Sequence, residues 1–577
     1  MPKIEIYQQS LFHYIGSKVE GERFLNLLTA AKAELDEPTN ADGLMKIELN
    51  DTNRPDLWST AGLGRQLRLH LGAAPRGYEF FSRAGSLQAT EERTILVDPG
   101  LAEVRPYIAG FAVSGKGVDE ATLKDLIQTQ EKLCWNYGRK RKSIAMGLYR
   151  TDLIEYPVRY TAVDPDTTRF VPLQESREMS LRQIIEEHPK GKEFGWIVSG
   201  MERMPFLTDN QGEVLSFPPI INSARLGAVE VGDERLFIEL TGTDIDSLLL
   251  TCSIVACDIA DAGFTIHPVR VEYPYDTPYG RELVTPFYFQ EAPSTTVGFV
   301  NSMLGMELDA SQITGALARM GISATVEGET INVTAPEYRN DFLHPVDIVE
   351  DVMIGHGMDL FEPEAPKDFT VGRLSEVERL ARQVKSLFVG LGYQEMIFNY
   401  LGSRKDFVEK MYPRQEWESR LAETVQIANP MSENYEFLRP SILPFLLAAE
   451  SVSANAVYPH RVFEVGKVAR VDESDVYGSR SIDLVGFLTA GAGEDFNSLY
   501  SHIAALLFYL QAGYRVEEGE DSRFIPGRVG RLVVAESGEP FGLFGELHPE
   551  VLEKWGIQVP CAAGEISIDF LLNPGLS

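Results

Sequence analysis

The segment DFLHPVDIVED, which runs from Asp341 to Asp351, places several carboxylates where a helix is expected to begin. Pro345 suits the first helical turn because proline has no backbone N–H that would need a partner there. In a helix over VDIVEDVMIG, Asp347, Glu350 and Asp351 stand at i, i+3 and i+4 and therefore share one face. Asp341 lies just before the helix and can fold back toward that face. The spacing predicts a helical unit with an acidic cluster at its amino end.

Two explanations account for this cluster. Carboxylates gathered at one helix start repel each other unless a cation holds them, and oxygen ligands without Cys or His suit Mg²⁺ or Ca²⁺ rather than zinc. The alternative is helix capping with solvated charge, because acids in the first turn complement the helix dipole and its free N–H groups. Taken alone, the segment favours capping. The candidate metal ligands are Asp341, Asp347, Glu350 and Asp351.

Length and composition predict a multidomain soluble protein. A chain of 577 residues exceeds one hydrophobic core, and 44% hydrophobic with 24% charged residues is ordinary for globular proteins. No apolar run is long enough to cross a bilayer, and the first residues lack the layout of a signal peptide. Four cysteines do not make a disulfide framework, and Cys252 and Cys257 lie in an apolar helical run typical of a core. We expect a cytoplasmic protein with no membrane contact.

The formal net charge of −32 restricts how the protein can meet nucleic acid. Phosphates repel so acidic a surface, so any contact with nucleic acid must be local or made largely by a partner. The one dense basic cluster is Arg139, Lys140, Arg141 and Lys142. It is either a solvated loop before the strand SIAMGLY or a phosphate contact, and the sequence leaves both open.

Turn residues and changes of periodicity divide the chain into four regions and predict the α+β class. An N-terminal α+β domain takes residues 1–90, and strands alternate with helices in 91–275. A helix, a hairpin and a second helix give 284–366 a helix-turn-helix or winged character. Strands dominate 367–577, where an antiparallel sheet with helices on it is expected. Expected helices include GERFLNLLTAAKAEL, TAGLGRQLRLHLG and LSEVERLARQVKSLFVGLGY, and QEMIFNYL is an expected strand.

The sequence carries no common catalytic motif. A Gly-rich phosphate loop after a strand is absent, as is a GxSxG elbow, and the nine His residues are scattered. Such a chain is more typical of a subunit of a larger enzyme.

Several segments, taken in order, resemble the β subunits of phenylalanyl-tRNA synthetases in their short archaeal and eukaryotic-like form. They are NRPDLWSTAGLGRQLRLHLG, FPPIINS with ELTGTD, YRNDF with DIVEDVMIGHGMDLFEP, and LRPSILPFLLAAES with RVFEVGKV and FGELHPEVLEKWGI. The resemblance covers nearly the whole chain. It implies a heterotetramer of two α and two β subunits that charges tRNA(Phe) with phenylalanine, with ATP and phenylalanine bound by the α subunit.

The resemblance also implies that residues 367–577 form a class II synthetase-like antiparallel sheet without catalytic motifs. Class II chemistry needs arginines that stabilise developing phosphate charge. Arg461 is out of the expected relation to Glu464, and FGELHPEVLEKWGI contains no arginine. Both segments are therefore interpreted as structural.

Two sites follow from the resemblance. Asp341, Asp347, Glu350 and Asp351 match the family's Mg²⁺-binding positions, of which the last is commonly Glu. Residues 91–275 match a domain that hydrolyses mischarged tyrosyl-tRNA, with the expected pocket residues Leu207, Ser216, Glu239 and Thr241. Glu239 replaces the usual Asp, and Tyr149 departs from the usual His-Asp strand ending.

Three hypotheses remain at this stage. The first is a β subunit with an active editing site, and the second is a scaffold of the same enzyme whose pocket has decayed, as Glu239 and Tyr149 suggest. The third is a free-standing nucleic-acid-binding protein that uses the helix-turn-helix-like unit, against which the acidic charge argues.

Overall fold

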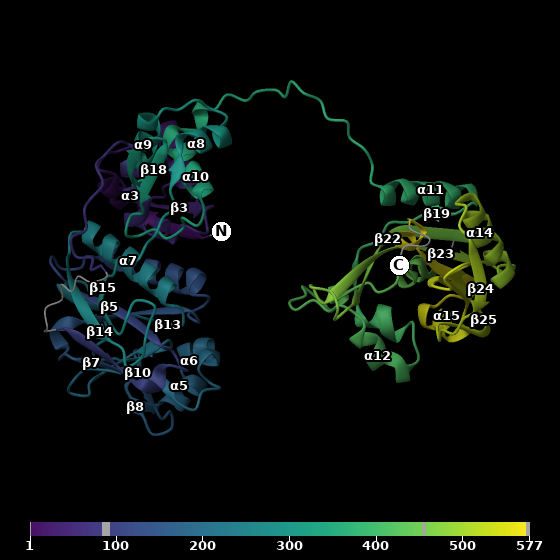
Figure 1. Cartoon of the computed structure of the whole chain (residues 1–577). Helices are drawn as coiled ribbons and strands as arrows, with labels where there is room; N and C mark the ends of the chain where they lie inside the picture. The colour runs from purple at the N-terminus through teal and green to yellow at the C-terminus, as the bar shows by residue number, and fades with distance from the viewer. Residues whose placement is uncertain (1, 84–92, 454–456, 573–577) are drawn as a thin grey trace. The chain divides into compact units, whose positions relative to one another are not determined.

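The computed structural model describes residues 2–83, 93–453 and 457–572 and divides the chain into two compact units (Figure 1). Unit 1 comprises residues 1–364 and unit 2 comprises residues 365–577. The expected boundary at residues 90 and 91 lies outside the described residues. No helix in the described ranges is both long and apolar enough to span a membrane.

Unit 1 begins with a three-stranded antiparallel sheet, in which β3 (Leu44–Leu49) lies between β1 (Lys3–Tyr7) and β2 (Ala33–Glu37). Its helices are α1 (Gln8–Ile15), α2 (Glu22–Leu28) and α3 (Thr60–His70). The helix expected over TAGLGRQLRLHLG is confirmed as α3, which Ser59 caps. The helix expected over GERFLNLLTAAKAEL is wrong in its second half. The chain leaves the helix after Leu28, passes through Lys32 at φ 48°, and pairs as β2.

A sheet of ten strands forms the centre of unit 1. Its order is β12-β11-β10-β7-β4-β14-β5-β13-β6, with β15 paired to β14. The strands are β4 (Thr94–Val97), β5 (Tyr107–Ser114), β6 (Ile144–Arg150), β7 (Val158–Val163), β10 (Met204–Thr208), β11 (Val214–Phe217), β12 (Ile221–Asn222), β13 (Arg235–Gly242), β14 (Thr265–Glu272) and β15 (Glu282–Thr285). The helices α4 (Glu120–Lys132), α5 (Leu181–Glu187) and α6 (Pro189–Phe194) lie in the same region of sequence.

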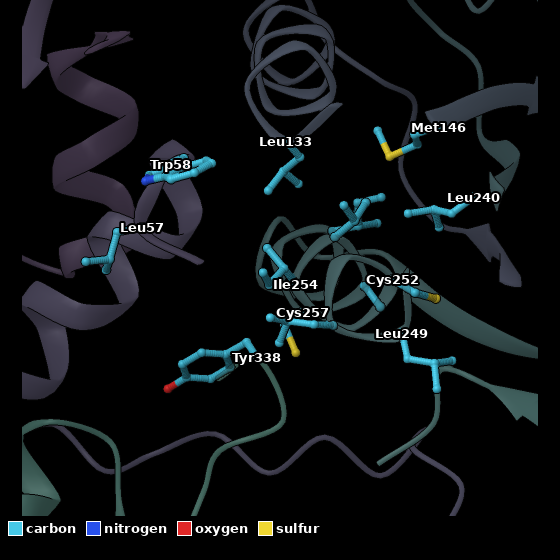
Figure 2. Packing of buried hydrophobic residues seen from close by; sticks show 14 of the residues in the cluster. Leu57, Trp58, Leu133, Met146, Leu240, Leu249, Cys252, Ile254, Cys257 and Tyr338 are labelled. Atoms are coloured by element: carbon cyan, nitrogen blue, oxygen red, sulfur yellow. The ribbon is translucent and has the colours of Figure 1, made fainter. Parts of the chain in front are cut away.

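The helix α7 (Ile245–Asp261) is buried along most of its length and packs against β5, β13 and β14. Asp244 caps this helix, since its carboxylate accepts a hydrogen bond from the Ser247 N–H. Cys252 and Cys257 are buried core residues, as predicted. Figure 2 shows α7 in the core with Leu240 of β13 to one side and Trp58 to the other. One apolar core therefore joins the N-terminal sheet region to the ten-stranded sheet.

The last part of unit 1 is a small helical module. Its strands are β16 (Thr295–Thr296), β17 (Ser323–Glu327) and β18 (Thr330–Thr334), and its helices are α8 (Val297–Leu304), α9 (Ala310–Arg319) and α10 (Pro345–His356). The expected hairpin turns at Gly328, whose φ is 64°. The helix expected after Pro345 is confirmed as α10. A Cβ on Gly355 would lie 2.1 Å from the Ala316 carbonyl oxygen, so α9 and α10 cross at a distance that only glycine permits.

Unit 2 is built on a seven-stranded sheet of order β19-β22-β23-β27-β26-β25-β24, antiparallel except for the β19–β22 pair. The strands are β19 (Gln394–Glu395), β22 (His460–Val471), β23 (Ser479–Ala490), β24 (Tyr514–Glu518), β25 (Phe524–Val534), β26 (Pro540–Leu547) and β27 (Cys561–Ser567), and the helices are α11 (Glu376–Gly390), α12 (Trp417–Ala422), α13 (Leu443–Val452), α14 (Phe496–Tyr509), α15 (Pro549–Trp555) and α16 (Ile568–Leu572). The strand expected over QEMIFNYL is only partly formed, because pairing with β22 stops at Glu395. The helix expected over LSEVERLARQVKSLFVGLGY is confirmed as α11, which packs into the core of unit 2: Phe388 stacks on Phe463 with ring centroids 4.9 Å apart.

Candidate functional site

The strand β13 carries two of the expected pocket residues on one face, because Glu239 and Thr241 are two positions apart. Glu239 pairs in register with Gly147 of β6. The phenol of Tyr149, two residues further along β6, donates a hydrogen bond to Glu239 Oε2 at 2.7 Å. Glu239 is 2% exposed and Tyr149 is fully buried, so this carboxylate–phenol pair lies inside the domain.

Gly147 makes room for this pair. A Cβ at position 147 would lie 2.1 Å from Tyr149 Oη and 2.5 Å from Glu239 Oε2, well inside contact distance. Burial raises the pKa of Glu239 to about 7, although the Tyr149 hydrogen bond and the nearby Arg105 both lower it. Burial also raises the pKa of Tyr149 well above its usual value, so the phenol keeps its proton and remains a donor. Near neutral pH the Glu239 carboxyl can therefore be either protonated or ionised.

Ser216 and Leu207 lie opposite each other across β10 and β11. The Ser216 hydroxyl lies near the Tyr149 phenol and lowers the pKa of Tyr149, but it makes no hydrogen bond of good geometry among the described residues. The side-chain oxygen of Asn222 is 3.4 Å from the same phenol oxygen. The structure therefore brings Glu239 and Ser216 together around one phenol. Leu207 is fully buried opposite Ser216 and forms part of the wall of this site.

Thr241 is held by a buried arginine that the sequence analysis missed. Arg105 Nε donates to Thr241 Oγ1 at 3.0 Å, and a second nitrogen donates to the Thr241 carbonyl at 2.6 Å. The same guanidinium donates to the carbonyls of Arg141 at 3.3 Å and Lys142 at 2.9 Å. Arg105 thus ties the end of β13 to the basic segment before β6. No spacing rule links positions 105 and 241, so only the folded sheet reveals this contact.

Arg339 organises the acidic cluster. Its guanidinium donates two hydrogen bonds to Asp341, at 3.0 and 2.6 Å, and two to Asp351, at 3.0 and 2.8 Å. Arg339 and Asp351 are each 3% exposed. Burial alone would raise both carboxyl pKa values. At Asp341 the Arg339 charge prevails and the pKa is lowered, whereas at Asp351 burial prevails and the pKa is raised.

The other two acids have separate partners. Asp347 Oδ2 accepts the backbone N–H groups of Leu343 and His344, each at 2.7 Å, which is the capping role considered for this segment. Glu350 forms an ion pair with Lys32, the residue at the left-handed turn before β2. Among the described residues, no group of three or more His, Cys, Asp or Glu side chains could hold a metal ion. The four carboxylates, as they are engaged here, do not fit a Mg²⁺ ligand set.

The candidate arginines of unit 2 are occupied in structural contacts. Arg461 donates to Glu494 at 3.0 Å and to the Leu391 carbonyl at 3.4 Å. Arg439, which is 1% exposed, donates to Glu464 at 2.8 Å and to the Lys467 carbonyl at 2.8 Å. Each guanidinium is therefore paired with a glutamate of the same unit.

Comparison with known proteins identifies the class, which is that of aminoacyl-tRNA ligase subunits, and then the family. Residues 362–568 match the model of the phenylalanyl tRNA synthetase beta chain CLM domain, and residues 294–358 match that of the tRNA synthetase B5 domain. The chain is 45% identical over 574 residues to the phenylalanine–tRNA ligase beta subunit of Borrelia turicatae and 42% identical over 611 residues to that of Treponema pallidum. Each alignment covers 99% of this chain and 100% of the relative. The chain therefore belongs to the phenylalanine–tRNA ligase beta subunit family.

A solved structure agrees with this assignment. An N-terminal fragment of the phenylalanyl-tRNA synthetase beta subunit from Pyrococcus horikoshii aligns with a TM-score of 0.57 and 32% identity, covering 62% of this chain and 100% of the fragment. The hypothesis of a free-standing nucleic-acid-binding protein is set aside, because the family assignment spans the full chain.

Proposed function

We propose that this chain is the β subunit of a cytoplasmic heterotetramer of two α and two β subunits, in which the α subunit binds ATP and phenylalanine and makes the aminoacyl-adenylate for tRNA(Phe). The family assignment and the structural engagement of Arg439 and Arg461 support this division of labour. Unit 2 would then be a class II synthetase-like domain without synthetic chemistry. Co-purification with the α subunit, followed by phenylalanine aminoacylation, tests the proposal. Aminoacylation by this chain without its partner would contradict it.

We further propose that residues 91–275 hydrolyse mischarged tyrosyl-tRNA(Phe). One observation carries this proposal: the buried carboxylate of Glu239 accepts a hydrogen bond from a phenol, here that of Tyr149. A tyrosyl group can offer the same hydrogen bond. A phenylalanyl ring would leave the buried acceptor unpaired, which costs binding and favours removal of tyrosine over phenylalanine. For a substrate ring to reach Glu239, the Tyr149 ring has to move aside.

The experiment uses the assembled enzyme and preformed tyrosyl-tRNA. Glu239→Gln keeps the size of the side chain but removes the carboxylate, and Thr241→Val removes the hydroxyl that Arg105 binds. Both variants are expected to lose tyrosyl-tRNA hydrolysis while the α subunit still activates phenylalanine. Hydrolysis at the wild-type rate in both variants would remove the editing assignment.

A second candidate function has its own support. Tyr149 is fully buried and already satisfies Glu239, as expected if the pocket is permanently filled and the chain serves only as a scaffold. The Tyr149→Ala variant separates the two candidates. If editing operates, the wild-type complex hydrolyses tyrosyl-tRNA; if the pocket is filled, only the variant does so. Both versions would still form the complex that aminoacylates tRNA.

Magnesium at the acidic cluster is not part of this proposal. The family resemblance implies it, but Arg339 and Lys32 already supply positive charge to three of the four carboxylates. Removal of divalent cations tests this reasoning.

A further inference from the structure

The basic segment Arg139–Lys142 has an unusual backbone. Arg139, Lys140 and Arg141 have φ values of 50°, 55° and 67°, so three consecutive residues with side chains occupy the left-handed region. This conformation is unfavourable for residues with a Cβ atom and persists only where surrounding contacts impose it. Here the three N–H groups donate to the carbonyls of Asn136, Trp135 and Cys134. The buried Arg105 guanidinium binds the carbonyls on the far side of the turn.

The cationic side chains of this turn lack ion-pair partners in the part of the chain that the structure describes. None of its four cationic side chains forms an ion pair within the described residues, although the chain has 85 acids and 53 basic residues. Arg141 donates only to the carbonyls of Pro219 and Ile220 and lies over the Phe194 ring. Neighbouring cations without a carboxylate partner create a local positive potential on this acidic protein, and that potential attracts a polyanion.

An aromatic surface adjoins the turn. An open hollow of about 1140 Å³ is lined by Arg139 and Lys140 together with Trp135 and Trp58. Trp135 is 46% exposed, and the Lys140 ammonium lies 5.4 Å from its ring centroid. The indole N–H of Trp58 is buried and has no hydrogen-bond partner among the described residues. Cations beside an exposed aromatic ring are the combination that binds single-stranded nucleic acid, where phosphates meet charge and a base stacks.

The hollow is connected to the Glu239 site by one strand. β13 runs from Glu239 through Thr241, and the chain continues to Thr243, which lines the hollow. Four residues of extended chain cover about 13 Å. This is a span that the last few nucleotides of a single strand can bridge. The Arg105 guanidinium holds both Thr241 and the basic turn, so the relative position of the two is fixed.

We propose that the turn Arg139–Lys142 and Trp135 form a binding site for the single-stranded 3′ end of the tRNA. Arg139 and Lys140 bind its phosphates, a terminal base stacks on Trp135, and the strand delivers the aminoacyl group toward Glu239. This inference rests on the proposed editing function and names the subsite that its substrate uses. For the basic cluster, the proposal favours a phosphate contact over a solvated loop.

The test uses the assembled enzyme and tRNA(Phe) that carries tyrosine through a stable amide bond, so that binding is measured without hydrolysis. The double variant Arg139→Gln/Lys140→Gln is compared with Arg177→Gln/Arg182→Gln, which removes the same charge from exposed residues paired with acids elsewhere in the domain. Loss of two phosphate contacts should lower the slope of log affinity against log salt by about 1.4. Trp135→Ala should weaken binding about fivefold or more. The control variant should match the wild type.

A trimmed tRNA that lacks its single-stranded 3′ end locates the contact. The Arg139/Lys140 variant should bind trimmed tRNA as the wild type does, because the contact has already been removed. Equal losses on trimmed and intact tRNA, or no loss at all, would overturn the inference, and unchanged melting temperatures show that the variants fold. Absence of tyrosyl-tRNA hydrolysis by the wild-type complex would instead remove the editing proposal, and the binding data would still report on the subsite.

Discussion

Arg339→Met should be among the most destabilising single substitutions in unit 1. The guanidinium makes four hydrogen bonds to Asp341 and Asp351, and methionine fills similar space without charge. Asp351 would remain 97% buried as a carboxylate with no paired cation in contact, since its exposed fraction is 3%. Removing one partner of a buried ion pair costs about 3–5 kcal/mol. The nearby Arg54 charge compensates in part, which favours the lower end of that range.

Calorimetry of the assembled enzyme measures this loss as a shift in the transition that contains unit 1. The double variant Arg339→Met/Asp351→Asn is the internal control. It removes the Asp351 charge, which the single variant leaves buried without a cation partner. It should recover part of the stability lost in Arg339→Met, since contacting residues are not additive. A loss below about 1 kcal/mol for Arg339→Met, or a double variant as unstable as the sum of the two single changes, would refute the reasoning.

Three further predictions concern the acidic cluster around Arg339 and the buried Glu239–Tyr149 pair. EDTA should shift the melting temperature by less than about 1 °C, because Arg339, Lys32 and backbone N–H groups already hold the four carboxylates of the acidic cluster. A larger shift reversed by Mg²⁺ would contradict this. The pKa of Glu239 is raised from 4.5 to about 7 in the folded state, so between these values the folded protein holds a proton that the unfolded chain has lost, and stability falls as pH rises. In calorimetric scans, Glu239→Gln should therefore gain stability relative to the wild type between pH 4.5 and 8, by on the order of 3 kcal/mol; a constant difference would refute the shift. Gly147→Ala should lower stability by about 1–3 kcal/mol in the same scans, because its Cβ would meet Tyr149 Oη at 2.1 Å, and an unchanged melting temperature would contradict the observed packing.

Local signals in the sequence predicted those elements in which pattern and packing agree. Pro345 begins α10 as expected, because proline has no backbone N–H that would need a partner in the first helical turn. The second half of the helix expected over GERFLNLLTAAKAEL was wrong for a tertiary reason. Those residues have an apolar pattern compatible with a helix, but β3 offers them a strand partner.

In the candidate sites, too, some residues were predicted from the sequence and others appear only in the folded structure. The resemblance identified Glu239, and its position on one strand face with Thr241 followed from the period of a strand. The partners that determine what these residues can do, Tyr149 and Arg105, come from other strands and segments and have no fixed spacing from them. Arg339 was also missed, although it lies only two residues before Asp341 and its proximity in sequence was a signal that could have found it.

The measurement that tests the account most directly is ATP–pyrophosphate exchange with phenylalanine, made on this chain alone and again after addition of the α subunit. In unit 2, Arg439 is bound to Glu464 and Arg461 is bound to Glu494. We predict background exchange for the isolated chain and full exchange for the assembled complex. Appreciable exchange by the isolated chain would contradict the assignment of synthesis to the partner.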